Sequence, residues 1–141
     1  MISKSVKNTI EFGKAFAKTL KGGEVVLLDG QLGAGKTHFA KGVAMGLNIT
    51  DTVTSPTFTL HNIFEGGKFT LNHFDFYRID SEEEALNLGL SEYFGEEKSV
   101  CLIEWWQNVK GLLPRSVKKV SIKIIDLNKR EIIISDENID N

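Results

Sequence analysis

"EVVLLDGQLGAGKTHFAKGVAMGL", residues 24–47, is the stretch of sequence that decides the fold. It opens with a short and continuous apolar run, which is typical of a strand buried on both faces of a sheet. A glycine-rich turn follows, and after it apolar residues recur at helical spacing. The order of strand, turn and helix predicts a domain that combines a buried sheet with covering helices.

The turn, "GQLGAGKT" at residues 30–37, fits the pattern G-x-x-x-x-G-K-[ST] at every position. Its glycines let the backbone wrap closely, so that successive N–H groups can point inward toward phosphate oxygens. The N-terminus of the following helix adds about half a positive charge at the same place. The pattern predicts a phosphate-binding loop, and the alternative is an ordinary glycine-rich turn before a helix.

Three side chains at the end of this loop have separate expected roles. Lys36 brings a full positive charge for the β- and γ-phosphates of a nucleotide, and the Thr37 hydroxyl can ligate Mg²⁺. We expect His38 on the helix surface rather than in catalysis. The predicted nucleotide-binding positions of this stretch are Gly30, Gly33, Ala34, Gly35, Lys36, Thr37 and His38.

Further helices and strands are predicted around this unit. Periodicity predicts a helix over residues 5–21, and a capping box of Ser81 and Glu84 starts another. Strands are expected at the end of 54–64, over 68–77 and 99–105, and in a terminal hairpin of 118–126 and 130–135. This order implies a mixed sheet covered by helices.

Size and composition limit the class of protein. The 141 residues, 41% apolar and 26% charged, suit one globular domain, which we expect over 1–135 with a polar C-terminal tail over 136–141. A net charge of −2 argues against tight direct binding to nucleic acid, which usually needs a basic excess. One cysteine, a polar N-terminus and the lack of any long apolar run together predict a cytoplasmic protein without a membrane span.

Two carboxylates are candidate partners for a metal or an attacking water. Glu104 ends the apolar run "VCLIE", and Asp75 lies in "LNHFDFYRID", residues 71–80, where alternation puts it on one side with His73 and Tyr77. Each acid has an ordinary alternative. Asp75 can be a solvent-facing acid on an edge strand, and Glu104 can be a strand-end acid paired with a lysine.

The turn "TSPT", residues 54–57, offers hydroxyl groups beside a proline. Pro56 stiffens the turn and favours extended geometry at the residue before it. Such a segment can sense a γ-phosphate, although an ordinary turn explains the same residues.

These stretches together resemble the TsaE family, also called YjeE. The resemblance rests on "LDGQLGAGKT", "TSPTFTL", "HFDFYR", "LGL" with "EYF", and "LIEW", in order and over nearly the whole chain. Family members are small bacterial P-loop ATPases needed to make threonylcarbamoyladenosine on tRNA. The resemblance implies an α/β, P-loop NTPase-like three-layer fold with a mixed parallel/antiparallel sheet flanked by helices.

The resemblance also assigns roles to residues. It implies that Thr37 and Asp75 hold Mg²⁺, that Glu104 is the catalytic acid or binds a metal-bound water, and that Lys36 acts with it. Thr57 becomes the candidate to approach the γ-phosphate. The resemblance also implies that the "HFDFYR" box is braced by hydrogen bonds and a salt bridge of His73, Tyr77 and Arg78. It places Trp105 either near the site or in apolar surroundings as an anchor.

Two positions depart from the family pattern. Trp106-Gln107 stands where many members have proline or alanine followed by an acid, which puts in doubt any role for an acid at position 107. His38 stands where many members have threonine. Neither departure changes the glycine and lysine pattern of the phosphate loop.

The implied activity is hydrolysis of ATP with Mg²⁺, by an accessory protein that acts with TsaB and TsaD homologues and meets tRNA only through that complex. The alternative is a nucleotide-gated binding protein without significant hydrolysis. A GTPase is disfavoured because the nearest match to N/T-K-x-D is "NKRE" at 128–131. A small-molecule kinase is disfavoured because the chain after "LIEW" has no room for an arginine-bearing lid.

Overall fold

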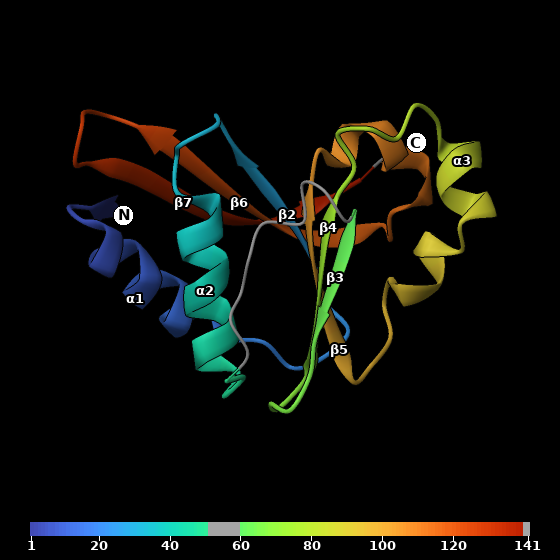
Figure 1. Ribbon diagram of the computed structural model, residues 1–141, viewed down its shortest axis with the longest axis horizontal. Helices are drawn as coiled ribbons and strands as arrows, with labels where there is room; N and C mark the ends of the chain where they lie inside the picture. Colours follow the sequence, from blue (N-terminus) through green and yellow to red (C-terminus); the bar gives the residue numbers. More distant parts are fainter. Residues whose placement is uncertain (51–59, 140–141) are drawn as a thin grey trace.

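The computed structural model describes residues 1–50 and 60–139, which are arranged around one twisted sheet (Figure 1). The described residues form strands in the order β1-β7-β6-β2-β5-β4-β3. Their bounds are β1 (Ile2–Ser3), β2 (Val25–Gly30), β3 (His61–Phe64), β4 (Thr70–Asp75), β5 (Ser99–Glu104), β6 (Ser116–Ile124) and β7 (Arg130–Asn138).

Helices cover both faces of the sheet. They are α1 (Val6–Ala17), α2 (Lys36–Gly46) and α3 (Glu82–Asn87), with the short 3₁₀ helices η1 (Leu90–Tyr93) and η2 (Trp106–Leu112). Figure 1 shows α1 and α2 on one side of β4 and β5, and α3 on the other. No helix in the described part of the chain is both long enough and apolar enough to cross a membrane.

Strand β2 illustrates why the sheet has a core on each face. Val26 and Leu28 join the apolar cluster under α1 and α2, whereas Val25 and Leu27 join the cluster under α3, η1 and η2. Because successive side chains of a strand point to opposite faces, a continuous apolar run supplies both cores at once. The expected three-layer α/β fold is therefore confirmed.

The sheet is mixed, as expected. Strand β2 pairs in parallel with β5 and β6, and β5 pairs in parallel with β4. The outer pairs β3 with β4, β6 with β7, and β1 with β7 are antiparallel. Parallel pairing brings the carboxyl ends of β2, β4 and β5 to one edge of the sheet, where the loops after these strands meet.

Three details differ from the sequence-based expectations. Helix α1 ends at Ala17 rather than near residue 21, because the chain turns there to bury Leu20. Strand β7 continues through Asn138, and Asp136 pairs with Lys118 at 2.8 Å, so the expected polar tail begins inside the sheet. The strand β1 and the 3₁₀ helices were not predicted, because they are too short to leave a periodic signal.

Helices α1 and α2 cross at glycines. A Cβ atom on Gly13 would collide with the carbonyl oxygen of Phe39, and one on Gly42 would collide with that of Ile10. The two backbones therefore approach more closely than any other residue would allow. This crossing fixes the position of α2, whose first residue, Lys36, belongs to the phosphate loop.

We expect Gly42→Ala to lower the free energy of unfolding by about 1–3 kcal/mol, the usual cost of overpacking. This expected loss of stability is opposite to the effect of helix propensity, which favours alanine over glycine by about 1 kcal/mol. Urea denaturation measures the change. The control Met45→Ala alters an exposed position of the same helix and should shift stability by less than about 0.5 kcal/mol. A Gly42→Ala protein as stable as the wild type would contradict the close crossing.

Candidate nucleotide site

A hollow of about 570 Å³ opens at the edge where β2, β4 and β5 end. It receives side chains from the phosphate loop, from the start of α2 and from the ends of β4 and β5. The lining residues are Leu32, Gly33, Gly35, Lys36, Thr37, His38, Asp75, Tyr77, Glu104 and Trp105. Segments far apart in the sequence therefore meet at the place where the sequence predicted phosphate binding.

The loop between β2 and α2 depends on glycine at two positions. Gly35, the residue before α2, has a left-handed backbone with φ of 109° and leaves the first N–H groups of the helix without a side-chain cap. Gly30 lies against β6, where a Cβ atom would come 2.8 Å from the carbonyl oxygen of Ile122. The uncapped N–H groups and the helix dipole make this end of α2 suited to an anion.

Glu104 is buried at the tip of β5 and is held by two donors. Its Oε1 lies 3.2 Å from Nζ of Lys36, and its Oε2 lies 2.8 Å from Nε2 of His73. Burial raises the pKa of the Glu104 carboxyl, but the hydrogen bond and charge of His73, together with Lys36, outweigh burial, so the pKa lies below its usual value. Glu104 is thus a strand-end acid paired with a lysine, which was the alternative to a catalytic role. That lysine, however, belongs to the phosphate loop.

Asp75 ends β4 beside Glu104, since these two residues are partners in the parallel register. It is only 8% exposed, and β4 lies between β5 and β3, so the interpretation of Asp75 as a solvent-facing acid on an edge strand is wrong. One carboxylate oxygen, Oδ1, accepts the N–H of Tyr77 at 2.9 Å.

The donor set at the hollow fits a magnesium ion. The Thr37 hydroxyl and the Asp75 carboxylate both line it, and oxygen donors of this kind suit Mg²⁺. Within residues 1–50 and 60–139, however, no three His, Cys, Asp or Glu side chains gather closely enough to hold a metal by themselves. A metal here would therefore need further oxygen ligands, which phosphate groups and water supply.

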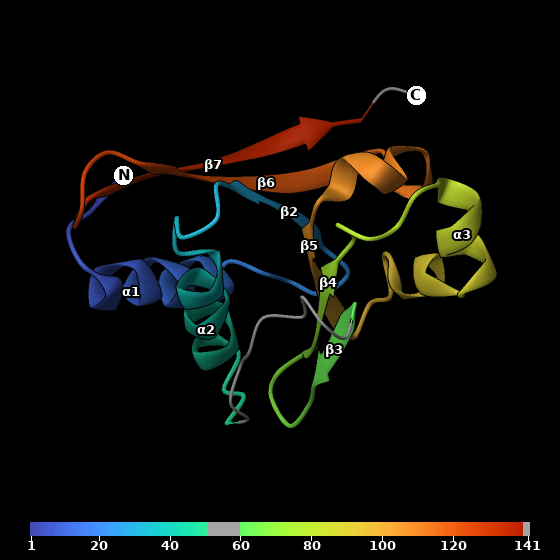
Figure 2. The same ribbon diagram turned by 45° about the horizontal axis from the view of Figure 1, so that its top comes forward.

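Arg130 supports the loop from outside and was missed by the sequence analysis. Its Nε donates to the carbonyl oxygen of Ala34 at 3.0 Å, and its Nη2 donates to that of Gly33 at 3.3 Å. Figure 2 shows β6 and β7 lying over α1, and Arg130 is the first residue of β7. These two contacts satisfy carbonyl groups of the loop from the side of β7. No local pattern signals a contact across 96 residues.

Most of the predicted site residues are brought together. Gly33, Gly35, Lys36, Thr37, His38, Asp75 and Glu104 all line the hollow. Gly30 and Ala34 do not, and the Ala34 side chain is buried beneath the loop. His38 is half-buried, rather than on the free surface of the helix, and also lines a second hollow of about 120 Å³ with Arg130. Ser55, Pro56 and Thr57 lie outside the described residues.

The rest of the "HFDFYR" box divides between the interior and the surface. His73 is hydrogen-bonded to Glu104 of the neighbouring strand β5, and not to another residue of this stretch. Arg78 is exposed and forms no salt bridge with any residue that the structure describes. Tyr77 packs its ring 4.9 Å from that of Trp105, which is 47% exposed and has a left-handed backbone. Trp105 thus lies at the mouth of the hollow and is not a buried anchor.

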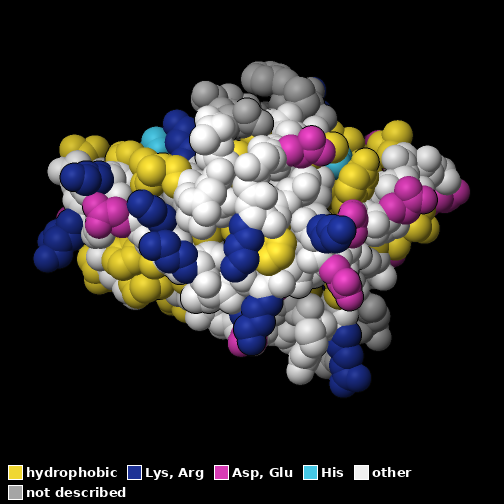
Figure 3. Space-filling view, turned by 90° about the horizontal axis from the view of Figure 1, so that it is seen from below, with side chains coloured by type: hydrophobic (Ala, Val, Ile, Leu, Met, Phe, Trp, Pro, Cys, Tyr) yellow, Lys and Arg dark blue, Asp and Glu magenta, His cyan; other side chains and the backbone are white. Residues whose placement is uncertain are grey.

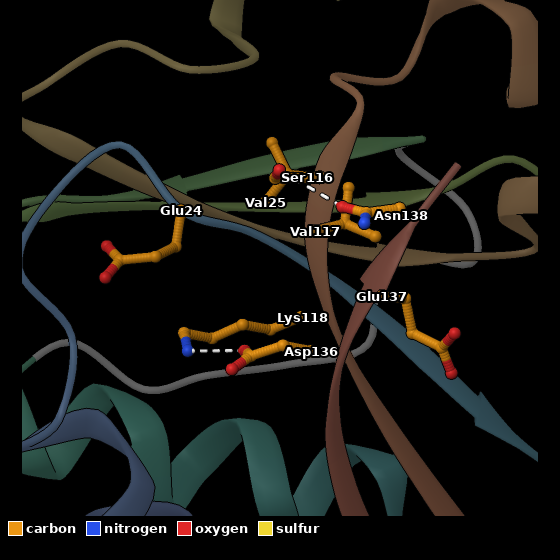
Figure 4. A pocket seen from close by; sticks show the side chains of 8 residues that line it. All are labelled: Glu24, Val25, Ser116, Val117, Lys118, Asp136, Glu137 and Asn138. Atoms are coloured by element: carbon orange, nitrogen blue, oxygen red, sulfur yellow. Dashed lines mark hydrogen bonds and ion pairs between the residues drawn. The ribbon is translucent and has the colours of Figure 1, made fainter. Parts of the chain in front are cut away.

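Another hollow, of about 380 Å³, lies between Glu24 and the ends of β6 and β7 (Figure 4). Its charged groups already have partners. Lys118 pairs with Asp136, and the Glu24 carboxylate accepts the backbone N–H groups of Lys21 and Gly22 at 2.7 and 2.8 Å. These contacts stabilise a turn and a strand pair, so the hollow at the phosphate loop is the candidate functional site.

A buried strand, a glycine-rich phosphate loop and a helix, with an acid at the tip of the adjacent parallel strand, define a P-loop NTPase-like protein. The family model described as "Threonylcarbamoyl adenosine biosynthesis protein TsaE" matches residues 3–132, and the chain belongs to this family.

Individual relatives agree with this assignment. The TsaE protein of Treponema pallidum is 39% identical over 135 residues, which is 95% of this chain and 98% of the relative. The Bacillus subtilis TsaE protein is 43% identical over 126 residues, 89% of this chain and 78% of the relative. The crystal structure of Bacillus subtilis YdiB has a TM-score of 0.82 and 36% identity, and the match covers 98% of this chain and 84% of that one.

The lowered pKa of Glu104 implies that the free energy of unfolding depends on pH. Because the folded pKa lies below the unfolded value, near 4.5, the carboxylate stabilises the fold above that pH. This contribution disappears as the pH falls through the folded pKa. The stability difference between the wild type and Glu104→Gln should therefore shrink between neutral pH and values below 4.5. Urea unfolding without nucleotide measures it, and a difference that stays constant with pH would contradict the assignment.

Proposed function

We propose that this protein binds ATP with Mg²⁺ and hydrolyses it as an accessory step in the formation of threonylcarbamoyladenosine in tRNA. One observation carries the proposal: Lys36, Thr37, Asp75 and Glu104, from three separate elements, line one hollow at the phosphate loop. The printed names of the relatives, which describe proteins of tRNA threonylcarbamoyladenosine biosynthesis, support the pathway.

Binding of the triphosphate rests on the loop and on Lys36. The uncapped N–H groups at the start of α2 face an incoming anion, and Lys36 is the cation beside them. In the structure this lysine pairs with Glu104, so a bound β- or γ-phosphate would compete with the carboxylate for the ammonium group. The nucleotide would thereby release one oxygen of Glu104.

Thr37 and Asp75 are the residues that would hold Mg²⁺, with Glu104 as a third ligand either directly or through water. The ion supplies charge neutralisation at the phosphates. The chain contributes two neighbouring carboxylates, both of which are buried.

Glu104 is the proposed general base. Its lowered pKa keeps it ionised at neutral pH, and its position at the tip of β5 puts it on the wall of the hollow. A carboxylate there can accept a proton from the water that attacks the γ-phosphate. This role separates the proposal from a nucleotide-gated binding protein without hydrolysis, in which Glu104 would serve only to hold Lys36 and His73.

The proposed partners are TsaB and TsaD homologues, with tRNA reached only through their complex. The charge of the chain supports an indirect contact with tRNA. The net charge is −2, and the face shown in Figure 3 carries acidic as well as basic side chains. A protein that grips nucleic acid alone usually carries a continuous basic surface.

A multiple-turnover tRNA modification assay tests the proposed function. Purified TsaB and TsaD homologues are combined with tRNA and a donor of the threonylcarbamoyl group, with and without this protein, in the presence of ATP. Repeated turnover should require the wild-type protein and be lost with Glu104→Gln. Full turnover with Glu104→Gln would favour the nucleotide-gated alternative, and no dependence on the protein would contradict the pathway assignment.

Lys36→Ala should weaken ATP binding about ten- to a hundredfold or more, because a charge-assisted contact contributes on the order of 1.5–3 kcal/mol. Calorimetric titration measures the affinity. Lys41→Ala is the matched control, since Lys41 belongs to the same helix and does not line the hollow. Equal affinities for the wild type and Lys36→Ala would contradict the phosphate-loop assignment.

Binding of ATP with Mg²⁺ should also raise Tm. At a hundred times Kd, ligand binding adds about 2.7 kcal/mol of stability, which corresponds to roughly 5–11 °C for a domain of this size. Asp75→Asn should lose the part of the shift that needs Mg²⁺ and keep the part seen with EDTA. Asp80→Asn, at an exposed acid nearby, should behave like the wild type. A Mg²⁺-dependent shift that Asp75→Asn leaves intact would exclude Asp75 as a ligand.

A further inference from the structure

The buried imidazole of His73 has one described partner, the carboxylate of Glu104. His73 lies on β4 opposite Leu102 of β5, so it is the diagonal neighbour of Glu104 on the same face of the sheet. Its side chain is completely buried, and its Nε2 lies 2.8 Å from Oε2 of Glu104. A carboxylate oxygen is only an acceptor, so Nε2 carries the donated proton.

The second ring nitrogen of His73, Nδ1, helps to explain why a histidine occupies this position. Nδ1 of His73 is buried and has no hydrogen-bond partner within the described parts of the chain. A buried polar atom without a partner costs free energy, so apolar side chains would suit this position better if only packing mattered. Among the described residues, the hydrogen bond of this ring is therefore the one to Glu104.

The two oxygens of Glu104 have donors of different kinds. Oε1 is held by Lys36, which lines the hollow and can turn to a phosphate. Oε2 is held by His73, whose ring is fully buried and does not line the hollow. When Lys36 changes partner, only one of these two contacts is lost.

We infer that His73 is a positioning residue: it holds Oε2 of Glu104, so that Oε1 is the oxygen released to accept the proton of the attacking water. This inference rests on the proposed ATP hydrolysis. The terminal torsion of a glutamate side chain has a broad and roughly two-fold energy profile, so an unheld carboxylate would rotate and exchange its oxygens. A carboxylate held at one oxygen keeps the other in a single position, which proton transfer requires.

The test separates turnover from binding. His73→Leu should lower kcat for ATP hydrolysis about ten- to a hundredfold, the usual loss when a supporting hydrogen bond is removed from a functional group. Kd for ATP, measured by calorimetric titration, should stay within about threefold of the wild type, because His73 does not line the hollow. His73→Gln carries an amide donor near the position of Nε2 and should restore most of kcat.

Two further variants control for folding and for general effects of losing a histidine. His61→Gln changes the imidazole of the neighbouring strand β3, which bonds Asn72 at 2.9 Å instead of Glu104, and should match the wild type. If His73→Leu does not fold, His73→Asn replaces it: the shorter amide is polar but cannot reach Oε2, so it should lose kcat where His73→Gln keeps it.

A double-mutant cycle completes the test. In a Glu104→Gln background, His73→Leu should add no further loss to the residual kcat for ATP hydrolysis, because both residues act through the same carboxylate. Additive losses, or an unchanged kcat in His73→Leu alone, would overturn the role of His73 while leaving the hydrolysis intact. Wild-type protein that binds ATP without any turnover would overturn the proposed hydrolysis itself, and the role of His73 with it.

Discussion

The parallel register of β2, β5 and β4 is the constraint on which the candidate site depends. Glu104 is opposite Leu28 on one side and Asp75 on the other, so the two acids and the start of the phosphate loop reach the same edge. A slip of one residue between β4 and β5 would turn Asp75 to the opposite face of the sheet. Phe74 and Phe76, both fully buried on that face, oppose such a slip. The apolar core thus determines where the carboxylates lie.

Charge burial at the site is balanced locally. An isolated carboxylate in the interior would be costly, and Glu104 is tolerated because each of its oxygens has a donor. Such a buried arrangement is seldom the most stable choice, since apolar residues of similar volume often serve stability equally well. The tip of β5 is therefore better understood as a functional feature, like the uncapped start of α2 and the left-handed Trp105 that follows Glu104.

Local patterns predicted much of this arrangement. The phosphate loop could be predicted because its chemistry lies within eight consecutive residues, 30–37, and Glu104 because an acid ended an apolar run. Contacts between strands could not be predicted, because the sequence pattern of a single strand does not determine which strands lie beside it. The bond between His73 and Glu104 and the support of the loop by Arg130 belong to this group. The expected salt bridge of Arg78 is not formed with any described residue, because the strand ends at Asp75 and leaves Arg78 exposed.

The position of Arg130 has a consequence for the order in which the protein is made. Strand β2 and its loop emerge early from the ribosome, but their sheet neighbours, β5 and β6, are synthesised only from Ser99 onward. The arginine that holds the loop's carbonyl groups comes later still. Because domains generally fold as units during synthesis, the complete candidate site cannot form before β5, β6 and Arg130 have been made. Nascent fragments that end before the last hairpin would therefore lack the arginine that supports the phosphate loop.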